Sequence, residues 1–278
     1  TMKFTKMHGI SNDYIYINGA TETIDNLSEV AVKLSDRHTG IGSDGIVMIL
    51  PSKTCDFRMR MFNSDGSEAE MCGNASRCVG KYVFDKGLTK KTNISLETLA
   101  GKKTLNLHVV DGKVDMVTVD MGEPILRGTD IPTIFDLPTV VRQPIEVSGK
   151  TVLTTCVSMG NPHSVVYVDD VDSLDLEKIG PSYESHPAFP HKTNTEFVEV
   201  ISCNEVKMRV WERGAGETMA CGTGACAVAV ASVLNGFTDR DVCVKLRGGD
   251  LNIKWSEDDN HVYMKGSATT VFEGDVEI

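Results

Sequence analysis

Two cysteines stand in matching positions of this sequence and could carry out acid–base chemistry. Cys72 and Cys221 each precede a glycine and a short polar residue, at the start of a segment with helical character. A helix N-terminus offers free N–H groups and a positive dipole end, which should lower a thiol pKa from about 8.5. The other six cysteines fall on strand or helix patterns, as is typical of small buried apolar residues: Cys55, Cys78, Cys156, Cys203, Cys226 and Cys243.

Two equivalent thiols suit the inversion of a stereocentre. One group must remove a proton from one face of a carbon, and another must deliver a proton to the opposite face. A hydrolase or transferase would instead need one nucleophile with a nearby base, and no histidine-based triad accompanies either cysteine. The pair Cys72 and Cys221 therefore predicts an epimerase or racemase that needs no cofactor.

The two cysteines belong to two copies of one unit. When the sequence is shifted by 149 residues, residues 57–89 lie without gaps on 206–238, and the two Cys-Gly pairs coincide. The same shift places Asn12 on Asn161. Because one register serves motifs so far apart, we infer an internal duplication.

The apolar pattern predicts an α+β fold with one central helix per copy. Helical stretches at 74–84 and 223–234 follow the Cys-Gly pairs, and each ends shortly before a glycine. Weaker amphipathic segments at 27–34 and 174–179 supply a second helix to each copy. Strand patterns fall at 15–17, 46–50, 57–62, 105–110, 114–120, 152–157, 165–168, 196–201, 206–211, 242–246, 251–255 and 262–264.

From these elements we predict two pseudo-symmetric halves, each a strongly bent, mostly antiparallel sheet around a central helix. The N-terminal half should comprise 1–121 plus 267–278 and carry Cys72, and the C-terminal half should comprise 122–266 and carry Cys221. Residues 122–143 contain three prolines and are expected to link the halves. The active site is expected in the cleft between them.

Polar residues near the cysteines are candidate substrate contacts. Asn12 and Asn161 correspond under the offset, as do Asn63 and Glu212. Glu212 and the following Arg213 come directly after a predicted strand, so one could bind an ammonium group and the other a carboxylate. The alternatives are ordinary turn asparagines and an exposed ion pair. His8, His38 and His163 are scattered and favour loop or core roles, with His163 retained as a candidate.

Composition limits the remaining possibilities. A net charge of −11 argues against binding nucleic acid, which normally requires a basic face, and no apolar run is long enough to cross a membrane. Eight cysteines in 278 residues, without an export signal, indicate reduced thiols and a cytoplasmic protein. Their spacing matches no zinc pattern, so no metal is expected.

The G-x-G-x-x-G spacing at 40–45 runs from a helical stretch into a strand, unlike a dinucleotide site, so we interpret it as a turn.

Six segments of the chain resemble diaminopimelate epimerases, in the order found in that family. They are KMHGISNDY (6–14), DRHTGIGSDG (36–45), MFNSDGSEAEMCGNASRC (61–78), MGNPHSVVYV (159–168), KTNTEFV (192–198) and VWERGAGETMACGTGACA (210–227). The chain departs from the family at Gly45, where some members carry glutamine, at Ser11, where glycine is frequent, and at Ala75 and Ser76, which vary the stretch after Asn74.

The resemblance implies interconversion of LL- and meso-diaminopimelate, a step in making lysine and peptidoglycan precursors. It also implies a two-domain fold, a catalytic pair at Cys72 and Cys221, no cofactor, and often a homodimer. The family's substrate-contacting residues map onto Asn12, Asn63, Gly73, Asn74, Asn161, Asn194, Glu212, Arg213, Gly222 and Thr223.

Other functions fit parts of the pattern. A related two-cysteine racemase acting on histidine, proline or hydroxyproline is the main alternative. From other classes, a dithiol redox switch or a noncatalytic amino-acid-binding protein would also use these residues. Only an epimerase or racemase would exchange the substrate α-proton with solvent.

Overall fold

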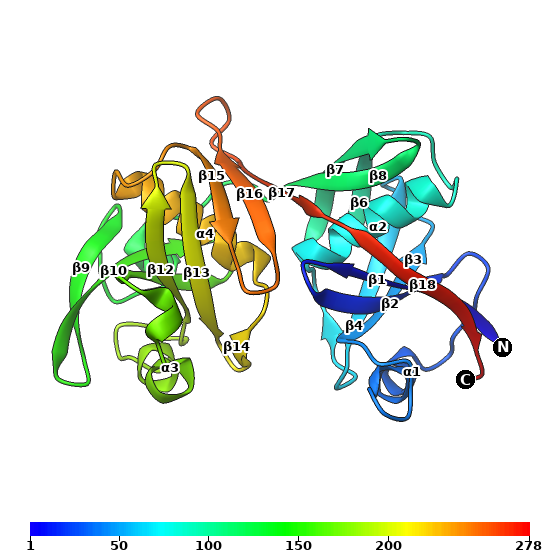
Figure 1. Cartoon of the computed structure of the whole chain (residues 1–278), viewed down its shortest axis with the longest axis horizontal. Helices are drawn as coiled ribbons and strands as arrows, with labels where there is room; N and C mark the ends of the chain where they lie inside the picture. Colours follow the sequence, from blue (N-terminus) through cyan, green and yellow to red (C-terminus); the bar gives the residue numbers. More distant parts are fainter. The chain divides into compact units, whose positions relative to one another are not determined.

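Runs of strands separated by single helices make up the chain in the computed structural model, which describes residues 1–278 (Figure 1). They form two units. The N-terminal unit comprises Thr1–Asp120 and Lys265–Ile278, and the C-terminal unit comprises Met121–Met264. The prediction of an α+β fold with two pseudo-symmetric halves is confirmed.

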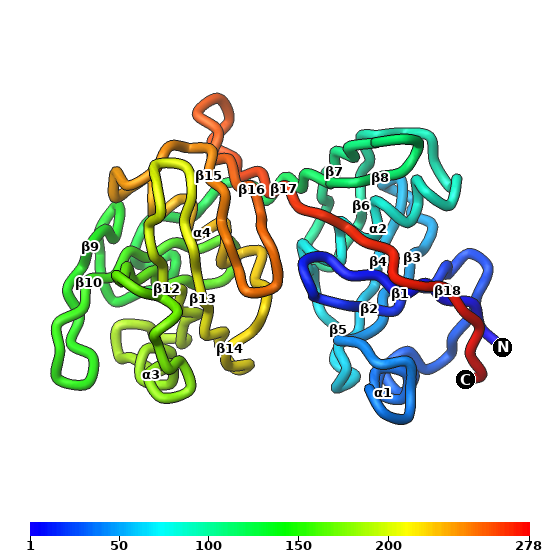
Figure 2. Tube along the Cα trace, in the orientation of Figure 1, coloured from blue at the N-terminus to red at the C-terminus, as the bar shows by residue number.

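In the N-terminal unit, antiparallel pairs dominate one continuous run of strands. The strands lie in the order β18-β1-β2-β3-β4-β6-β7-β8, with parallel pairing only at β2–β3 and β4–β6. The elements are β1 (Met2–Gly9), β2 (Asn12–Asn18), α1 (Leu27–Ser35), β3 (Gly45–Leu50), β4 (Phe57–Asn63), β5 (Glu68–Ala69), α2 (Gly73–Asp85), β6 (Asn93–Thr98), β7 (Gly101–Val110), β8 (Lys113–Asp120) and β18 (Thr269–Val276). Because β18 pairs with β1, the two chain termini lie together in this unit (Figure 2).

The C-terminal unit repeats this topology. Its strands lie in the order β9-β10-β11-β12-β13-β15-β16, with parallel pairing at β11–β12 and β13–β15. The elements are a 3₁₀ turn (Gly128–Asp130), β9 (Val140–Val147), β10 (Lys150–Ser158), β11 (Pro162–Tyr167), a second 3₁₀ turn (Val171–Ser173), α3 (Leu176–Glu184), β12 (Asn194–Ser202), β13 (Glu205–Glu212), β14 (Gly216–Thr218), α4 (Gly222–Leu234), β15 (Asp241–Lys245) and β16 (Asp250–Trp255). Strand β17 (Val262–Ser267) begins in this unit and ends in the N-terminal unit.

The 149-residue offset holds in the structure as well as in the sequence. It carries the bounds of α2 onto those of α4, and the bounds of α1 onto those of α3. Strand register follows it too, because Ile46 pairs with Phe62 in one unit and Thr195 with Trp211 in the other. The two units are therefore copies in fold as well as in sequence.

Each sheet curves around one central helix (Figure 1). Helix α2 contacts β1, β2, β7 and β8, and α4 contacts β10, β11, β12, β15 and β16. The residues of α4 explain its position, because a helix that is apolar on all sides is stable only when surrounded. In α2, Gly80 permits close packing, since a Cβ there would lie 2.8 Å from Leu107.

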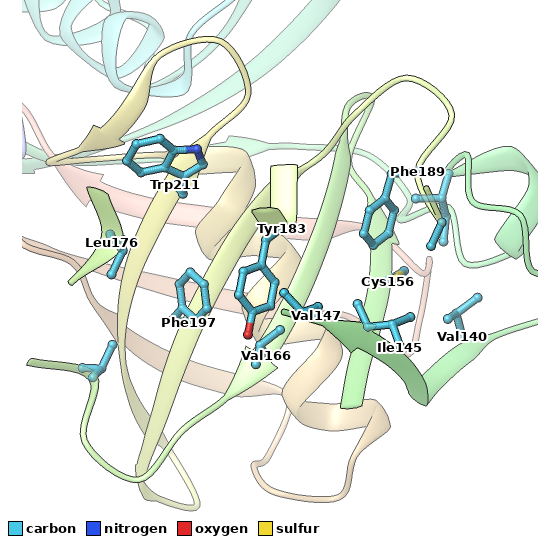
Figure 3. Packing of buried hydrophobic residues seen from close by; sticks show 13 residues of the cluster. Val140, Ile145, Val147, Cys156, Val166, Leu176, Tyr183, Phe189, Phe197 and Trp211 are labelled. Carbon is cyan, nitrogen blue, oxygen red and sulfur yellow. The ribbon is translucent and has the colours of Figure 1, made fainter. Parts of the chain in front are cut away.

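The outer helix of the C-terminal unit covers an aromatic cluster (Figure 3). Tyr183 and Phe197 meet edge to face with ring centroids 5.0 Å apart, and Trp211 joins the same cluster. Gly180 lies against that indole, where a Cβ would come within 2.2 Å of the ring. The prediction of a helix at 174–179 was therefore too short: α3 runs to Glu184 because tertiary packing carries it through Gly180 and Pro181, both weak helix formers.

Several other predicted boundaries differ from the structure. Strands β1, β5, β6, β9, β14 and β18 were not predicted, and β9 begins at Val140, inside the predicted linker 122–143. None of the helices combines the length and the apolar character needed to span a membrane.

Candidate active site

Cys72 occupies the N-cap of α2, where the backbone turns from an extended conformation (φ −143°, ψ 126°) into the helix. The first intrahelical bond runs from the Ser76 N–H to the Cys72 carbonyl (2.9 Å), so the N–H groups of Gly73, Asn74 and Ala75 precede it. Such N–H groups bind anions well. The Cys72 thiol is partly buried and donates a hydrogen bond to Asn12 Oδ1 (3.3 Å).

A short chain of amide contacts holds this thiol. Asn74 Nδ2 donates to Asn12 Oδ1 (3.3 Å), and Asn12 Nδ2 donates to Asp44 Oδ2 (2.8 Å). The structure therefore brings three candidate residues, Asn12, Gly73 and Asn74, together around Cys72. Asn63 lies at the end of β4 opposite Gly45 and donates from Nδ2 to Ser67 Oγ (3.1 Å).

Charged side chains support this network from one side. Arg37 contacts Asp13 (2.9 Å) and Asp44 (3.3 Å), and Lys6 contacts Asp13 (3.0 Å). Burial opposes ionisation of Asp13, but hydrogen bonds from Arg37 and Lys6 outweigh it and hold its pKa well below the usual range. Burial, together with the nearby Asp13 charge, raises the pKa of Asp44.

Cys221 occupies the same position on α4, with extended N-cap geometry (φ −133°, ψ 104°). Its sulfur accepts the Gly224 N–H (3.3 Å) and lies 3.7 Å from Thr223 Oγ1. The first intrahelical bond runs from the Ala225 N–H to the Cys221 carbonyl (3.0 Å), so the Gly222 and Thr223 N–H groups precede it. Cys221 is buried, at 6% exposure.

The sequence-based expectation of a lowered thiol pKa is wrong for Cys221. Burial raises its pKa well above the ordinary value, and the nearby Glu212 and Glu196 carboxyl groups raise it further. The Thr223 hydroxyl and the Gly224 N–H act in the opposite direction but are outweighed. The helix N-terminus was visible in the sequence, whereas the two carboxyl groups come from separate strands.

A buried pair stands behind this half-site. Asn161 Nδ2 donates to Thr223 Oγ1 (3.2 Å), and Asn161 Oδ1 faces His163 Nε2 (3.0 Å). His163 Nδ1 lies 2.6 Å from Glu196 Oε1, and both side chains are fully buried. The candidate His163 thus orients Asn161, which contacts a residue beside the thiol.

The remaining candidates lie at the ends of β12 and β13. Buried Asn194 donates to the Pro162 carbonyl (2.9 Å) and accepts the Arg213 backbone N–H (2.8 Å). The Arg213 side chain is exposed and donates to the His191 carbonyl (3.0 Å). Glu212 is hydrogen-bonded to Thr218 and Cys221, and burial raises its pKa.

Sequence reasoning missed Asp44 and Glu196. Asp44 lies within the 40–45 turn, and the structure confirms that this turn runs from α1 into β3. Its position next to Gly45 was the available signal. Glu196 gave none, because the offset aligns it with Val47 and breaks the repeat. No group of three or more His, Cys, Asp or Glu side chains is arranged to hold a metal ion.

Solved structures with the same two-unit fold come from several kinds of protein. A phenazine biosynthesis protein of the PhzF family from Bacillus anthracis superposes with a TM-score of 0.73, covering 100% of this chain and 99% of the other at 15% identity. A hydroxyproline epimerase from Agrobacterium vitis gives 0.67, covering 99% and 90% at 16% identity. The fold is thus that of the PhzF-like and proline-racemase-like proteins.

Sequence similarity narrows this class. The model of the family described as diaminopimelate epimerase matches residues 4–126 and 155–271. The chain is 64% identical over 277 residues to a diaminopimelate epimerase of Acetivibrio thermocellus, covering 100% of this chain and 99% of that protein. A diaminopimelate epimerase of Methanococcus maripaludis is 60% identical with full coverage of both chains. The chain belongs to the diaminopimelate epimerase family and is therefore an isomerase of the amino-acid epimerase type.

Proposed function

We propose that the protein interconverts LL- and meso-diaminopimelate, and so supplies lysine and peptidoglycan precursors. The observation that carries the proposal is the same N-cap cysteine in both units, at Cys72 and Cys221. One sulfur, as thiolate, takes the α-proton and becomes a thiol. The other, as thiol, gives its proton to the opposite face of the resulting carbanion and becomes a thiolate. No cofactor takes part, and each unit contributes one thiol.

The helix N-termini suit the carboxylate of the reacting centre. The N–H groups of Gly73 and Asn74 on α2, and of Gly222 and Thr223 on α4, precede the first intrahelical bonds. Aligned N–H groups of this kind stabilise negative charge that grows as the α-proton leaves. They act without a change in their own protonation.

The environment of Cys221 favours its role as a proton donor. Its raised pKa means that the thiol retains its proton near neutral pH. In the direction that uses Cys221 as the acid, Cys72 is the base. The Glu212 carboxyl group is hydrogen-bonded to Cys221 and therefore lies beside the thiol that donates the proton.

The polar residues away from the thiols suit a second zwitterionic head. Asn63, Asn161, Asn194 and Arg213 are more anchors than one amino-acid centre needs, and diaminopimelate carries a second ammonium and carboxylate. A site built to bond such a head discriminates against analogues that lack it. Arg213→Ala should lower kcat/KM for diaminopimelate by about tenfold or more, as loss of an Arg–carboxylate contact does, and should affect monoamino acids little.

Deuterium exchange at the α-carbon tests the chemistry. Wild-type protein in D₂O should incorporate deuterium into diaminopimelate and interconvert its epimers. Cys72→Ala and Cys221→Ala should each abolish inversion while keeping the fold, and each should at most exchange the α-proton of one epimer slowly. Near-normal epimerisation by either variant would refute the two-thiol mechanism. Absence of exchange in the wild type would favour the redox switch or binding protein.

Substrate preference tests the main alternative, a related two-cysteine racemase. A racemase acting on histidine, proline or hydroxyproline would keep both thiols in their roles but prefer another amino acid. We compare kcat/KM for diaminopimelate, lysine, histidine, proline and hydroxyproline. A preference for one of the last three would reassign the substrate.

We also propose a cytoplasmic homodimer with reduced thiols. All eight cysteines are free. Two large apolar side chains of β18, Val271 (55% exposed) and Phe272 (45%), would be covered by a second copy. Sedimentation of the wild type and of a Phe272→Lys variant tests this, and a monomeric wild type would refute it.

A further inference from the structure

A fully buried arginine lies one turn behind the Cys72 cap. Arg77, on α2, is the largest side chain in the chain with no solvent exposure. Burying a guanidinium is costly unless its donors are well used. The fold alone does not require it, because the equivalent position on α4 is Cys226, which is also fully buried.

Arg77 connects two parts of the N-terminal unit. Its Nη2 donates to Asn74 Oδ1 (2.7 Å), and its Nε donates to the Ser267 carbonyl (3.1 Å). Ser267 is 190 residues away, in the segment Lys265–Ile278 with which the chain returns to this unit. The planar guanidinium can serve both acceptors at once from fixed positions, which a lysine ammonium cannot reproduce.

The hydrogen bonds fix the orientation of the two amide groups between Arg77 and Cys72. Arg77 can only donate, so it fixes Asn74 with Oδ1 toward itself and Nδ2 toward Asn12. At the other end, the Asp44 backbone and carboxyl group hold the neighbouring strand, and Oδ2 accepts Asn12 Nδ2. Together they turn the Asn12 carbonyl oxygen toward the Cys72 sulfur, 3.3 Å away. A reversed amide would present N–H groups to the sulfur instead.

The C-terminal unit holds its asparagine with other residues. There His163 faces the carbonyl oxygen of Asn161, the equivalent of Asn12, and the Asn161 amide nitrogen donates to Thr223 Oγ1. The surroundings of the two asparagines have therefore diverged, because Cys72 donates to Asn12 whereas the Cys221 sulfur accepts the Gly224 N–H. A residue needed only for packing would not need to donate a hydrogen bond to the side-chain amide of Asn74.

We propose that Arg77 is a positioning residue for Cys72, which orients the Asn74 and Asn12 amides and ties them to the returning strand at Ser267. It acts through Asn74 and does not touch the substrate. The assignment rests on the proposed function for its effect on turnover. Its effect on the thiol itself can be measured without any substrate.

The test compares Arg77→Met and Arg77→Lys with Lys81→Met. Lys81 is a matched control, because it lies one turn further along α2 and also donates to a strand carbonyl, that of Val114 (2.6 Å). Each protein is treated with iodoacetamide, and the alkylation rates of Cys72 and Cys221 are read by peptide mass spectrometry. Cys221, in the other unit, serves as the internal reference. Thermal unfolding, kcat and KM are measured on the same samples.

We expect both Arg77 variants to lower kcat by about 10- to 100-fold with a smaller change in KM, as for a misplaced catalytic group. The ratio of Cys72 to Cys221 alkylation should change by about threefold or more, because thiol reactivity follows its surroundings. Lys81→Met should change neither. If Arg77→Met fails to fold, Arg77→Lys carries the test.

Two results would overturn the proposal. Full activity in Arg77→Lys would show that only the charge matters. A lowered melting temperature with unchanged kcat and unchanged alkylation ratio would show a purely structural role. If the wild type does not epimerise diaminopimelate but the alkylation ratio still shifts, the proposed function fails and the positioning role stands.

Discussion

The buried pair His163–Glu196 can be replaced by the residues that occupy the equivalent positions in the N-terminal unit. The equivalent residues in the N-terminal unit are Tyr14 and Val47, so this unit shows that the fold accepts an apolar residue in place of Glu196. We therefore consider Glu196→Val, His163→Tyr and the double variant. Each single change leaves one polar partner buried without the other, whereas the double change removes both.

The magnitudes follow from the geometry. His163 Nδ1 and Glu196 Oε1 are 2.6 Å apart, and neither side chain has any solvent exposure. Removing one member of such a buried pair costs about 3–5 kcal/mol. The larger tyrosine ring adds a packing cost of about 1–3 kcal/mol. The double variant should therefore be destabilised by much less than the sum of the singles, with a coupling energy of about 2–3 kcal/mol.

The assay is guanidinium unfolding followed by tryptophan fluorescence. Both tryptophans of the chain, Trp211 and Trp255, lie in the C-terminal unit, so the signal reports on the unit that carries the changes. A matched variant in the other unit, Val47→Ala, should leave this transition in place. Additive single-variant effects, with coupling below about 0.5 kcal/mol, would refute the claim that the two residues stabilise one another.

Two further predictions concern the N-terminal unit. Ser11 has a left-handed backbone (φ 74°) where the family frequently has glycine, so Ser11→Gly should not destabilise the protein, whereas Ser11→Val should lower its unfolding free energy by about 1–3 kcal/mol, measured by chemical denaturation. A stable Ser11→Val variant would contradict this. Because the pKa of Asp13 is lowered in the folded state, its ionisation stabilises the fold above its unfolded pKa near 3.8, and this contribution is lost as pH falls through the folded value. Wild type should therefore be more stable than Asp13→Asn at neutral pH, and the difference should shrink as acid is added. A difference that stays constant down to about pH 3 would refute the assignment.

Much of the fold could be predicted because the duplication doubles the evidence. A weak helical pattern at one place is strengthened when the same pattern recurs 149 residues later, and the bounds of α2 and α4 follow that rule. Elements outside the best-matching segments were harder to predict. Strand β18 is mostly exposed and lacks a clear alternation of apolar and polar residues, so its role depends on pairing with β1, more than 260 residues earlier in the chain.

In the site, too, features set by neighbouring residues could be predicted, and features set by residues far away in the sequence could not. The N-cap positions of the two cysteines follow from residues next to them, and the structure places both there. The surroundings of those caps do not. Burial and the Glu196 carboxyl group reverse the expected pKa shift of Cys221, and Arg77 finds its acceptor on Ser267. Such effects depend on which strands meet, which a pattern of neighbouring residues does not encode.

The residues around the two cysteines differ between the copies, and this difference matters for an epimerase. Identical halves place equivalent thiols and helix N-termini, but inversion needs one sulfur to accept a proton while the other donates. The copies keep the two N-cap cysteines and the asparagines Asn12 and Asn161, but Asn12 accepts the Cys72 S–H, whereas Asn161 donates to Thr223. In one unit the Arg77 guanidinium holds Asn74, which donates to the same Asn12 oxygen as the Cys72 thiol. In the other, the His163–Glu196 pair holds Asn161 while the Cys221 sulfur accepts a backbone N–H. The two thiols therefore have different surroundings: Cys72 is partly buried and donates to an amide oxygen, whereas burial and two nearby carboxyl groups raise the pKa of Cys221.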